Sequence, residues 1–390
     1  MQLSEIQTPA LILDRQKMQA NIDRMTGLID SRGIKLRPHL KTCKSIDVAR
    51  FALEKNFGGI TVATLNEAEY FAGFGIHDIL YGVCVTPDKF GRVKELQQKR
   101  VSMTLITDSL SVASLLTDLA PVGGTSVKVM VEVDCGEHRT GVLADDPALV
   151  DIAQCLHESG KVEFAGVFTH AGHSYQCRSI AEIERVAEDE RLAVVRAADI
   201  LRDRGIPCDN VSVGSTPTAL HAISTEGITE VRAGVYVFND LFQAVLQSCE
   251  VKDIAVSVLA TVISHDRLRN RMLIDAGGLA LSKDRSTSAT DFDAGYGRLI
   301  NAVGEDVFAN LCVTDTHQEH GEISSTEPLP FDQLPVGARV RVLPNHSCMT
   351  SAMYDCYHVV DGQNDKLVAV WPRTNGWQRT GFKHEVSARS

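Results

Sequence analysis

Residues 127–133 read VKVMVEV, residues 164–169 read FAGVFT, and the segment 146–159 between them has the apolar spacing of an amphipathic helix. Two apolar strands joined through a helix form the unit of a parallel sheet that is covered on its faces. We find eight such strand segments before residue 245, and they are 34–40, 59–63, 78–82, 102–106, 127–133, 164–169, 210–213 and 229–232. Eight strand-helix repeats predict a closed (β/α)8 barrel, and a doubly wound open sheet is the alternative.

The pattern changes after residue 250. Short runs rich in β-branched residues follow, separated by Gly, Asp and Asn, and they are 254–264, 271–275, 338–343 and 367–371. These runs predict a second domain built from β-strands. We therefore expect a barrel over residues 15–248 and a β-rich domain over residues 249–390. Within residues 1–14, the strand Ala10–Leu13 precedes the eight repeats, and we expect it to join the β-rich domain.

Bulk properties exclude several classes of protein. The formal net charge of −11 argues against a nucleic-acid partner and against binding to anionic membranes. No apolar run is long enough for a transmembrane helix, and the N-terminus lacks the pattern of a signal peptide. The ten cysteines are scattered singly with no CxxC pair, which indicates free thiols in a reducing cytoplasm.

Polar residues follow the seventh predicted strand in the turn Gly214-Ser215-Thr216-Pro217-Thr218. A proline in the first turn of a helix and free backbone N–H groups before it suit a phosphate dianion. Phosphate sites in such barrels also tend to follow strands seven and eight. The alternative is an ordinary Ser/Thr helix cap, which is the commoner use of this pattern.

Lys41 follows the first predicted strand, within RPHLKTCKS. A lysine that is desolvated at the mouth of a barrel has a lowered pKa and a free amine for imine formation. Taken alone, a lysine in this place is more often a solvated surface charge. The phosphate-type turn favours the functional interpretation, because a phosphorylated aldehyde cofactor needs both an amine and an anion site.

His346 and Cys348 are a candidate metal pair within PNHSC, at residues 344–348. If this segment is a strand, residues two apart point to the same face, so both side chains reach one ion. Two ligands suit an open catalytic zinc site that water or substrate completes. The spacing by itself favours the alternative of a buried cysteine beside a hydrogen-bonded histidine.

Six motifs together resemble the fold-type III pyridoxal-phosphate enzymes, and they are TPALILD, RPHLKT, THAGHSY, GSTPT, EVRAGVY and PNHSC. Within that group the chain is similar to the branch of D-serine dehydratase, D-threo-3-hydroxyaspartate dehydratase and D-threonine aldolase. The resemblance runs from about residue 8 to residue 377. It implies an alanine-racemase-like (β/α)8 barrel with a C-terminal β domain, pyridoxal phosphate as the cofactor, and a homodimer.

The resemblance also implies roles for individual residues. Lys41 would form the Schiff base with the cofactor and handle the α-proton of the substrate. Arg232 would lie against the pyridine nitrogen, and Arg139 near the phenolic oxygen. The phosphate would be held by Gly214, Ser215, Thr216 and Tyr236, and the ring or the substrate flanked by His170 and Tyr175.

The resemblance favours a metal site at His346 and Cys348 over a buried cysteine beside a hydrogen-bonded histidine. The dehydratases show His-x-Cys here, and the aldolases tend to show His-x-Asp. A thiolate favours zinc over magnesium or manganese on grounds of softness, and manganese, cobalt or magnesium are the alternatives to zinc. We expect a lyase that removes water from a D-3-hydroxy amino acid, such as D-threo-3-hydroxyaspartate or D-serine, giving a 2-oxo acid and ammonia. The alternatives are a retro-aldol enzyme of the D-threonine aldolase type, an amino-acid racemase, and a pyridoxal-phosphate-binding protein without catalysis.

Overall fold

The structure is a computed structural model, and it describes residues 1–119, 121–122, 126–308 and 311–378. The chain divides into two compact units. The first contains Met1–Met25 and Val235–Arg373, and the second contains Thr26–Gly234 and the residues from Thr374 onward. None of the helices in the described part of the chain is long and apolar enough to cross a membrane.

The second unit is built on a sheet of eight parallel strands in the order β2-β9-β8-β7-β6-β5-β4-β3. The strands are β2 (Lys35–Leu36), β3 (Ile60–Val62), β4 (Asp78–Cys84), β5 (Ser102–Thr107), β6 (Lys128–Glu132), β7 (Glu163–Phe168), β8 (Asn210–Val213) and β9 (Glu230–Val231). All neighbours pair in parallel. Each strand overlaps one of the eight predicted segments.

The first and last strands of this order also meet. A parallel bridge joins His39, just beyond β2, to Thr61 of β3. Around it, the Leu40 N–H donates to the Thr61 carbonyl at 2.9 Å, and the Thr61 N–H donates to the Pro38 carbonyl at 2.9 Å. The sheet therefore closes on itself, which confirms the barrel and excludes the open doubly wound sheet.

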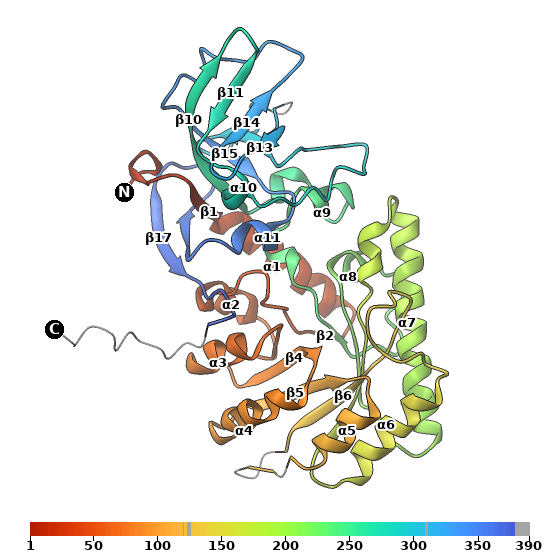
Figure 1. Cartoon of the computed structure of the whole chain (residues 1–390). Coiled ribbons are helices and arrows are strands. Elements are labelled where there is room, and N and C mark those ends of the chain that lie inside the picture. The colour runs from red at the N-terminus through yellow and green to blue at the C-terminus, as the bar shows by residue number, and fades with distance from the viewer. Residues whose placement is uncertain (120, 123–125, 309–310, 379–390) are drawn as a thin grey trace, which may run out of the picture. The chain divides into compact units, whose positions relative to one another are not determined.

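Helices cover the outer side of this sheet, as Figure 1 shows for α3 to α7 around β4, β5 and β6. The helices are α1 (Arg15–Ser31), α2 (Ile46–Leu53), α3 (Leu65–Gly73), η2 (Pro87–Lys89), α4 (Phe90–Gln98), α5 (Leu110–Leu116), α6 (Pro147–Glu158), η3 (Gly172–Gln176), α7 (Ile180–Asp203) and α8 (Thr216–His221). Several begin at a polar cap: the side chain of Thr64 accepts the Glu67 N–H before α3, and that of Ser179 accepts the Glu182 N–H before α7. Buried strands with covered faces explain the continuous apolar runs of the sequence.

The first unit is built on a mixed sheet in the order β13-β14-β11-β10-β1-β16-β17, with β15 paired to β10 and β12 paired to β15. Its strands are β1 (Ala10–Asp14), β10 (Val256–Asp266), β11 (Arg271–Ile274), β12 (Arg298–Asn301), β13 (Asp315–Thr316), β14 (Gly321–Ser324), β15 (Arg339–Leu343), β16 (Cys356–Val360) and β17 (Leu367–Pro372). Its short helices are η1 (Leu3–Glu5), η4 (Val235–Val237), α9 (Leu241–Val245), η5 (Val251–Asp253), α10 (Gly278–Leu281) and α11 (Ser347–Ser351). Strand β1 is antiparallel to β10 and parallel to β16.

The expected domain boundary between residues 248 and 249 lies later in the chain than the division at Gly234 and Val235. Backbone hydrogen bonds give the reason. The Leu241 N–H donates to the Pro344 carbonyl at 3.0 Å, and the Ala255 N–H donates to the Phe238 carbonyl at 2.8 Å. The segment from Val235 to residue 248 therefore belongs with the β-rich unit.

Candidate functional site

Lys41 follows the segment that closes the barrel, and it is exposed, so the desolvation expected from the sequence is not seen. Its positive charge lowers the pKa of two histidines of the same unit. Burial, together with the positive charges of Lys41 and Arg232, holds the pKa of His39 and of His170 well below the ordinary value. Both imidazoles are therefore neutral at pH 7. The Nδ1 of His170 donates to the Gly214 carbonyl, so its Nε2 is an acceptor.

Arg232, just after β9, is a buried guanidinium held by hydrogen bonds. Its Nε donates to the Ser212 hydroxyl at 2.8 Å, and its Nη2 donates to the carbonyl of Thr169. The guanidinium carbon lies 3.4 Å from the centre of the Phe168 ring. Burial lowers the pKa of Arg232 to about 10, so the group stays charged at neutral pH.

The turn from Gly214 to Thr218 contains the helix cap that the sequence suggested as one alternative. A Cβ on Gly214 would lie 3.0 Å from the Arg232 carbonyl oxygen, so the close approach of the two chains favours glycine. The Ser215 hydroxyl accepts the Thr218 N–H at 3.2 Å, which is the ordinary helix cap. The buried hydroxyl of Thr216 has no hydrogen-bond partner in the described structure. An unsatisfied buried hydroxyl beside a helix cap is a place for a ligand oxygen.

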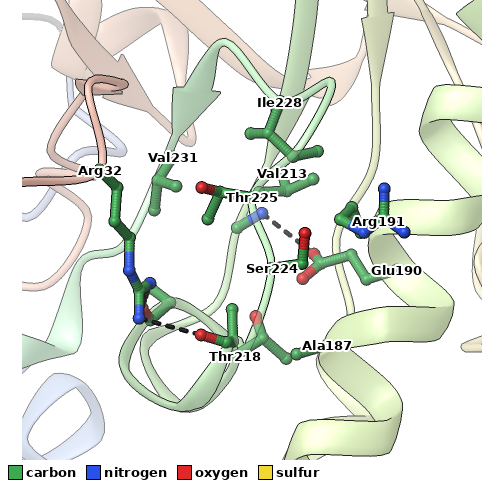
Figure 2. A pocket seen from close by; sticks show the side chains of 13 residues that line it. Arg32, Ala187, Glu190, Arg191, Val213, Thr218, Ser224, Thr225, Ile228 and Val231 are labelled. Atoms are coloured by element: carbon green, nitrogen blue, oxygen red, sulfur yellow. Dashed lines mark hydrogen bonds between the residues drawn. The ribbon is translucent and has the colours of Figure 1, made fainter.

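Glu190 of α7 lies behind this turn, and the sequence did not single it out. Its Oε1 accepts the N–H of Ala171 at 3.1 Å and that of Gly214 at 3.0 Å. The hydroxyl of Thr218 also donates to this carboxylate. Figure 2 shows Glu190 and Thr218 among the side chains around one pocket, which is lined in full by Arg32, Ala187, Glu190, Arg191, Val213, Gly214, Thr218, Ala219, Ala222, Ser224, Thr225, Ile228 and Val231.

Three further residues were expected to contact the cofactor, and they are Arg139, Tyr175 and Tyr236. Arg139 pairs with Glu137 at 3.3 Å, and its side chain is 56% exposed. Its charge is among those that lower the pKa of His170, after burial, Lys41 and Arg232, which places Arg139 on the same side of the barrel. Tyr175 is half-buried in η3. Tyr236 is buried in η4 and belongs to the first unit.

His346 and Cys348 lie in the first unit, at the start of α11. The segment is not a strand, so the alternation argument that paired these residues was wrong. Their side chains hydrogen-bond to each other nevertheless, with His346 as the N-cap residue and Cys348 in the first turn. The His346 Nδ1 lies 3.4 Å from a carboxylate oxygen of Asp284.

The surroundings of His346 favour a positive charge. Burial by itself lowers the pKa of His346, but the hydrogen bonds to Asp284 and Cys348 and the charge of Asp240 raise it to about 11. Groups that hold a proton on the imidazole also attract a cation in its place. His346 and Cys348 are therefore ligand-type side chains in surroundings that favour a positive charge.

Two buried residues of the first unit fix this segment. An Asp240 carboxylate oxygen accepts the Ser347 N–H at 3.0 Å. Asn345 donates through Nδ2 to the carbonyls of Asp284 at 3.1 Å and Gly295 at 2.7 Å. The loop that carries Asp284 is thereby held next to His346.

One further trio of ligand-type groups lies at neighbouring strand ends of the barrel. Atoms of Cys84, Asp108 and Glu132 lie within 4.8 Å of one another, and no other such trio occurs among the described residues. The Cys84 thiol donates to Glu132 at 2.9 Å. Burial and the two carboxylates raise the pKa of Cys84, so it stays a neutral thiol that shares its proton.

Comparison with known proteins agrees with this arrangement. The model of the alanine racemase N-terminal domain matches residues 13–241, and that of the putative serine dehydratase domain matches residues 255–360. The D-threo-3-hydroxyaspartate dehydratase of Delftia sp. (strain HT23) is 41% identical over 96% of this chain and 99% of its own. The chain belongs to this dehydratase branch of the alanine racemase-like family.

Further enzymes are similar over nearly the whole chain. The D-serine dehydratase of Dictyostelium discoideum is 32% identical over 95% of this chain and 97% of its own. The 3-hydroxy-D-aspartate aldolase of Paracoccus denitrificans (strain Pd 1222) is 29% identical over 95% of this chain and 92% of its own.

Solved structures of this family match over the full length. The Delftia sp. HT23 dehydratase superposes with a TM-score of 0.92 at 40% identity, covering 96% of this chain and 100% of that one. Two mutants of a D-threo-3-hydroxyaspartate dehydratase also match at 40% identity, over 97% of this chain, with TM-scores of 0.92 and 0.93. One has a cysteine replaced by alanine and is in a metal-free form, and the other has a histidine replaced two positions earlier.

The residues of this family member fit the cofactor that the family implies. Pyridoxal phosphate needs an amine, an anion site and a group for its ring nitrogen. Lys41 supplies the amine, the unpartnered hydroxyl of Thr216 supplies a donor for the phosphate, and Arg232 is a fixed charged donor. Ser215 lies in the same turn.

One signal for the missed Glu190 was present in the sequence. The buried face of α7 carries Ile183, Ala187, Glu190 and Val194, so the helical spacing places a carboxylate where an apolar residue is expected. Asp240 and Asp284 had no comparable signal, because aspartates in loops and at helix caps are common.

Proposed function

We propose that this chain removes water from a D-3-hydroxy amino acid, giving a 2-oxo acid and ammonia, and that D-threo-3-hydroxyaspartate is its substrate. The observation that carries the proposal is the 41% identity over 96% of the chain to a dehydratase named for that substrate. The aldolase relative is only 29% identical. The cysteine at position 348 supports the same choice, because it provides a thiolate in a metal pair.

The barrel residues have separate tasks in this reaction. When bound, pyridoxal phosphate supplies an electron sink for the negative charge that develops at the substrate Cα. The Lys41 amine holds the cofactor and takes the α-proton. His39 and His170 are neutral, so they add no positive charge that would lower the basicity of the Lys41 amine. Arg232 remains charged, so it keeps a ring nitrogen placed against it unprotonated.

The first unit supplies a cation site. His346 and Cys348 would hold a divalent metal, and an imidazole with a thiolate matches zinc best. The two mutated residues of the solved dehydratase have the same spacing as this pair, and the cysteine mutant is metal-free. A bound cation supplies Lewis acid chemistry for a departing hydroxyl, which a dehydratase needs and a racemase does not.

Product analysis tests the reaction. The purified protein is incubated in separate assays with D-threo-3-hydroxyaspartate, D-serine and D-threonine. We expect oxaloacetate and ammonia from the first and slower release of pyruvate and ammonia from D-serine. Glycine and acetaldehyde from D-threonine, without ammonia, would support the aldolase alternative instead.

The same proposal includes the assembly and the compartment. We infer a homodimer, as the resemblance to fold-type III enzymes implies, and light scattering of the purified protein tests it. All ten cysteines are free thiols in the structure, which suits the reducing cytoplasm. A mass shift after alkylation without reductant, equal to that after reduction, is the expected result.

A further inference from the structure

A chain of hydroxyl groups leads from the phosphate-type turn to the carboxylate of Glu190. The Ser174 and Ser215 oxygens lie 3.1 Å apart, and the Ser215 and Thr218 oxygens lie 2.8 Å apart. Thr218 then hydrogen-bonds to Glu190. All four side chains are buried, so these contacts are shielded from water. Each hydroxyl has one proton, which it donates in one direction only.

The ionised carboxylate fixes that direction. A carboxylate only accepts, so Thr218 must donate to Glu190. Thr218 then accepts from Ser215, and the Ser215 oxygen is left to accept the Thr218 N–H and the Ser174 hydroxyl. In this state the Ser215 hydroxyl donates its proton to Thr218, so it cannot donate a hydrogen bond to a phosphate in the turn.

A protonated Glu190 reverses the chain. Its carboxyl O–H donates to Thr218, and the hydroxyl of Thr218 donates to Ser215. The Ser215 proton is then free to point to a ligand. The Glu190 Oε1 already accepts two backbone N–H groups, so we expect the proton on Oε2, which leaves both of these hydrogen bonds in place.

We propose that Glu190 is a positioning residue of the phosphate turn, and that it takes up a proton when the cofactor phosphate binds, so that Ser215 donates to the phosphate. This inference rests on the proposed pyridoxal-phosphate function. The charge of the phosphate also favours protonation of Glu190, because a dianion near a buried carboxylate stabilises the neutral acid. Burial already raises the pKa of Glu190 above that of an exposed glutamate.

The other ionisable groups that face Glu190 keep one protonation state near neutral pH. Burial holds the pKa of His170 low, so it stays neutral, and burial raises the pKa of Cys135 to about 12, so it stays a thiol. Arg232 stays charged. Arg32 and Arg191 also line the pocket that Glu190 lines, and both are guanidinium groups that stay charged. A pH effect in this region therefore reports on Glu190.

The test compares pyridoxal phosphate with 5'-deoxypyridoxal, which lacks the phosphate and has no 5'-hydroxyl that could close on its own aldehyde. Both are titrated into cofactor-free full-length protein between pH 6.5 and 9.5 for the wild type, Glu190→Gln and Glu190→Ala. The ratio of the two affinities cancels effects on Lys41 and on the aldehyde, and it isolates the contribution of the phosphate.

For the wild type we expect this ratio to fall as pH rises, with a slope of at most about tenfold per pH unit for one proton. Glu190→Gln keeps an acceptor for the backbone and donates to Thr218, as the protonated acid does, so its ratio matches the highest wild-type value and loses the pH slope. Glu190→Ala leaves two buried N–H groups without an acceptor, and its ratio falls about tenfold or more.

Two results would overturn the proposal. One is a pH slope in Glu190→Gln equal to that of the wild type. The other is a Glu190→Gln ratio as low as that of Glu190→Ala. A general loss of folding lowers both affinities together and leaves the ratio unchanged, which also counts against a role in the turn. A wild-type chain that binds no pyridoxal phosphate contradicts the proposed function itself.

Discussion

The guanidinium Nε of Arg232 donates a 2.8 Å hydrogen bond to the hydroxyl of Ser212. Ser212 in turn donates to Glu230 at 2.7 Å, and Glu230 also pairs with Arg37 at 2.7 Å. Arg232 is thus the end of a buried polar network that runs through Ser212 and Glu230 to Arg37. Hydrogen bonds within the barrel fix the position of its guanidinium before any ligand binds.

Arg232→Met removes the charge from this network and leaves the Ser212 hydroxyl and the Thr169 carbonyl without their donor. We expect a loss of about 3 kcal/mol in the free energy of unfolding, as is typical when one member of a buried charged network is removed. Urea denaturation measures it. The control is Arg196→Met, whose pair with Asp145 is largely exposed and which should cost less than about 1 kcal/mol.

Lys41→Ala should abolish covalent attachment of pyridoxal phosphate. No other amine takes its place, so the visible absorbance of the lysine-bound cofactor disappears and the elimination activity falls at least about a thousandfold. Borohydride reduction followed by peptide mass analysis locates the modified lysine in the wild type. Lys35→Ala, which changes another exposed lysine near the same strand, serves as the control. Retained absorbance in Lys41→Ala would rule out this role.

Cys348→Ala should lower zinc affinity by more than about tenfold, because it removes a proposed direct ligand. Metal content after dialysis, measured by mass spectrometry, gives the result. Cys356→Ala changes another free cysteine of the same unit and should retain the metal. Equal metal contents in the two variants would show that Cys348 is not a ligand. Chelation of the wild type should abolish activity, and added zinc should restore it.

Asp284→Asn tests the carboxylate that lies beside His346. A neutral amide attracts the cation less and orients the imidazole less firmly, so we expect zinc affinity to fall about tenfold to a hundredfold. Competition with a chromogenic chelator measures this affinity. Asp293→Asn removes a partly exposed carboxylate paired with Arg285 and should leave the affinity unchanged. A similar loss in both variants would assign the effect to net charge.

His170 makes the cofactor-free protein less stable in mild acid. Its pKa is held below 6.5 in the folded state, so the unfolded chain binds a proton first as pH falls, and stability is lost below about pH 6.5. The slope is at most about 1.4 kcal/mol per pH unit for this group. His170→Asn keeps a donor for the Gly214 carbonyl but does not titrate, so denaturation between pH 4.5 and 7 should show a shallower slope.

His157→Asn, on the exposed side of α6, is the matched variant and should keep the wild-type slope. Identical slopes in His170→Asn and the wild type would show that other groups, His39 among them, carry the acid sensitivity.

Local patterns in the sequence were enough for the architecture and for the residues with reactive groups. Alternation of apolar strands and amphipathic helices predicts the barrel, because burial of a periodic apolar face depends on neighbours along the chain. Lys41, the Gly214 turn and the His346–Cys348 pair also stand out locally.

Only the tertiary structure revealed how these residues are held. Glu190 meets Gly214 across 24 positions, and Asp284 meets His346 across 62. It also showed that His346 and Cys348 meet at a helix start, where alternation along a strand had been expected. Contacts between distant segments arise from packing and loop geometry, which periodicity does not encode. The sequence therefore determined which chemical groups are present, and the fold decided which charges and hydrogen bonds surround them.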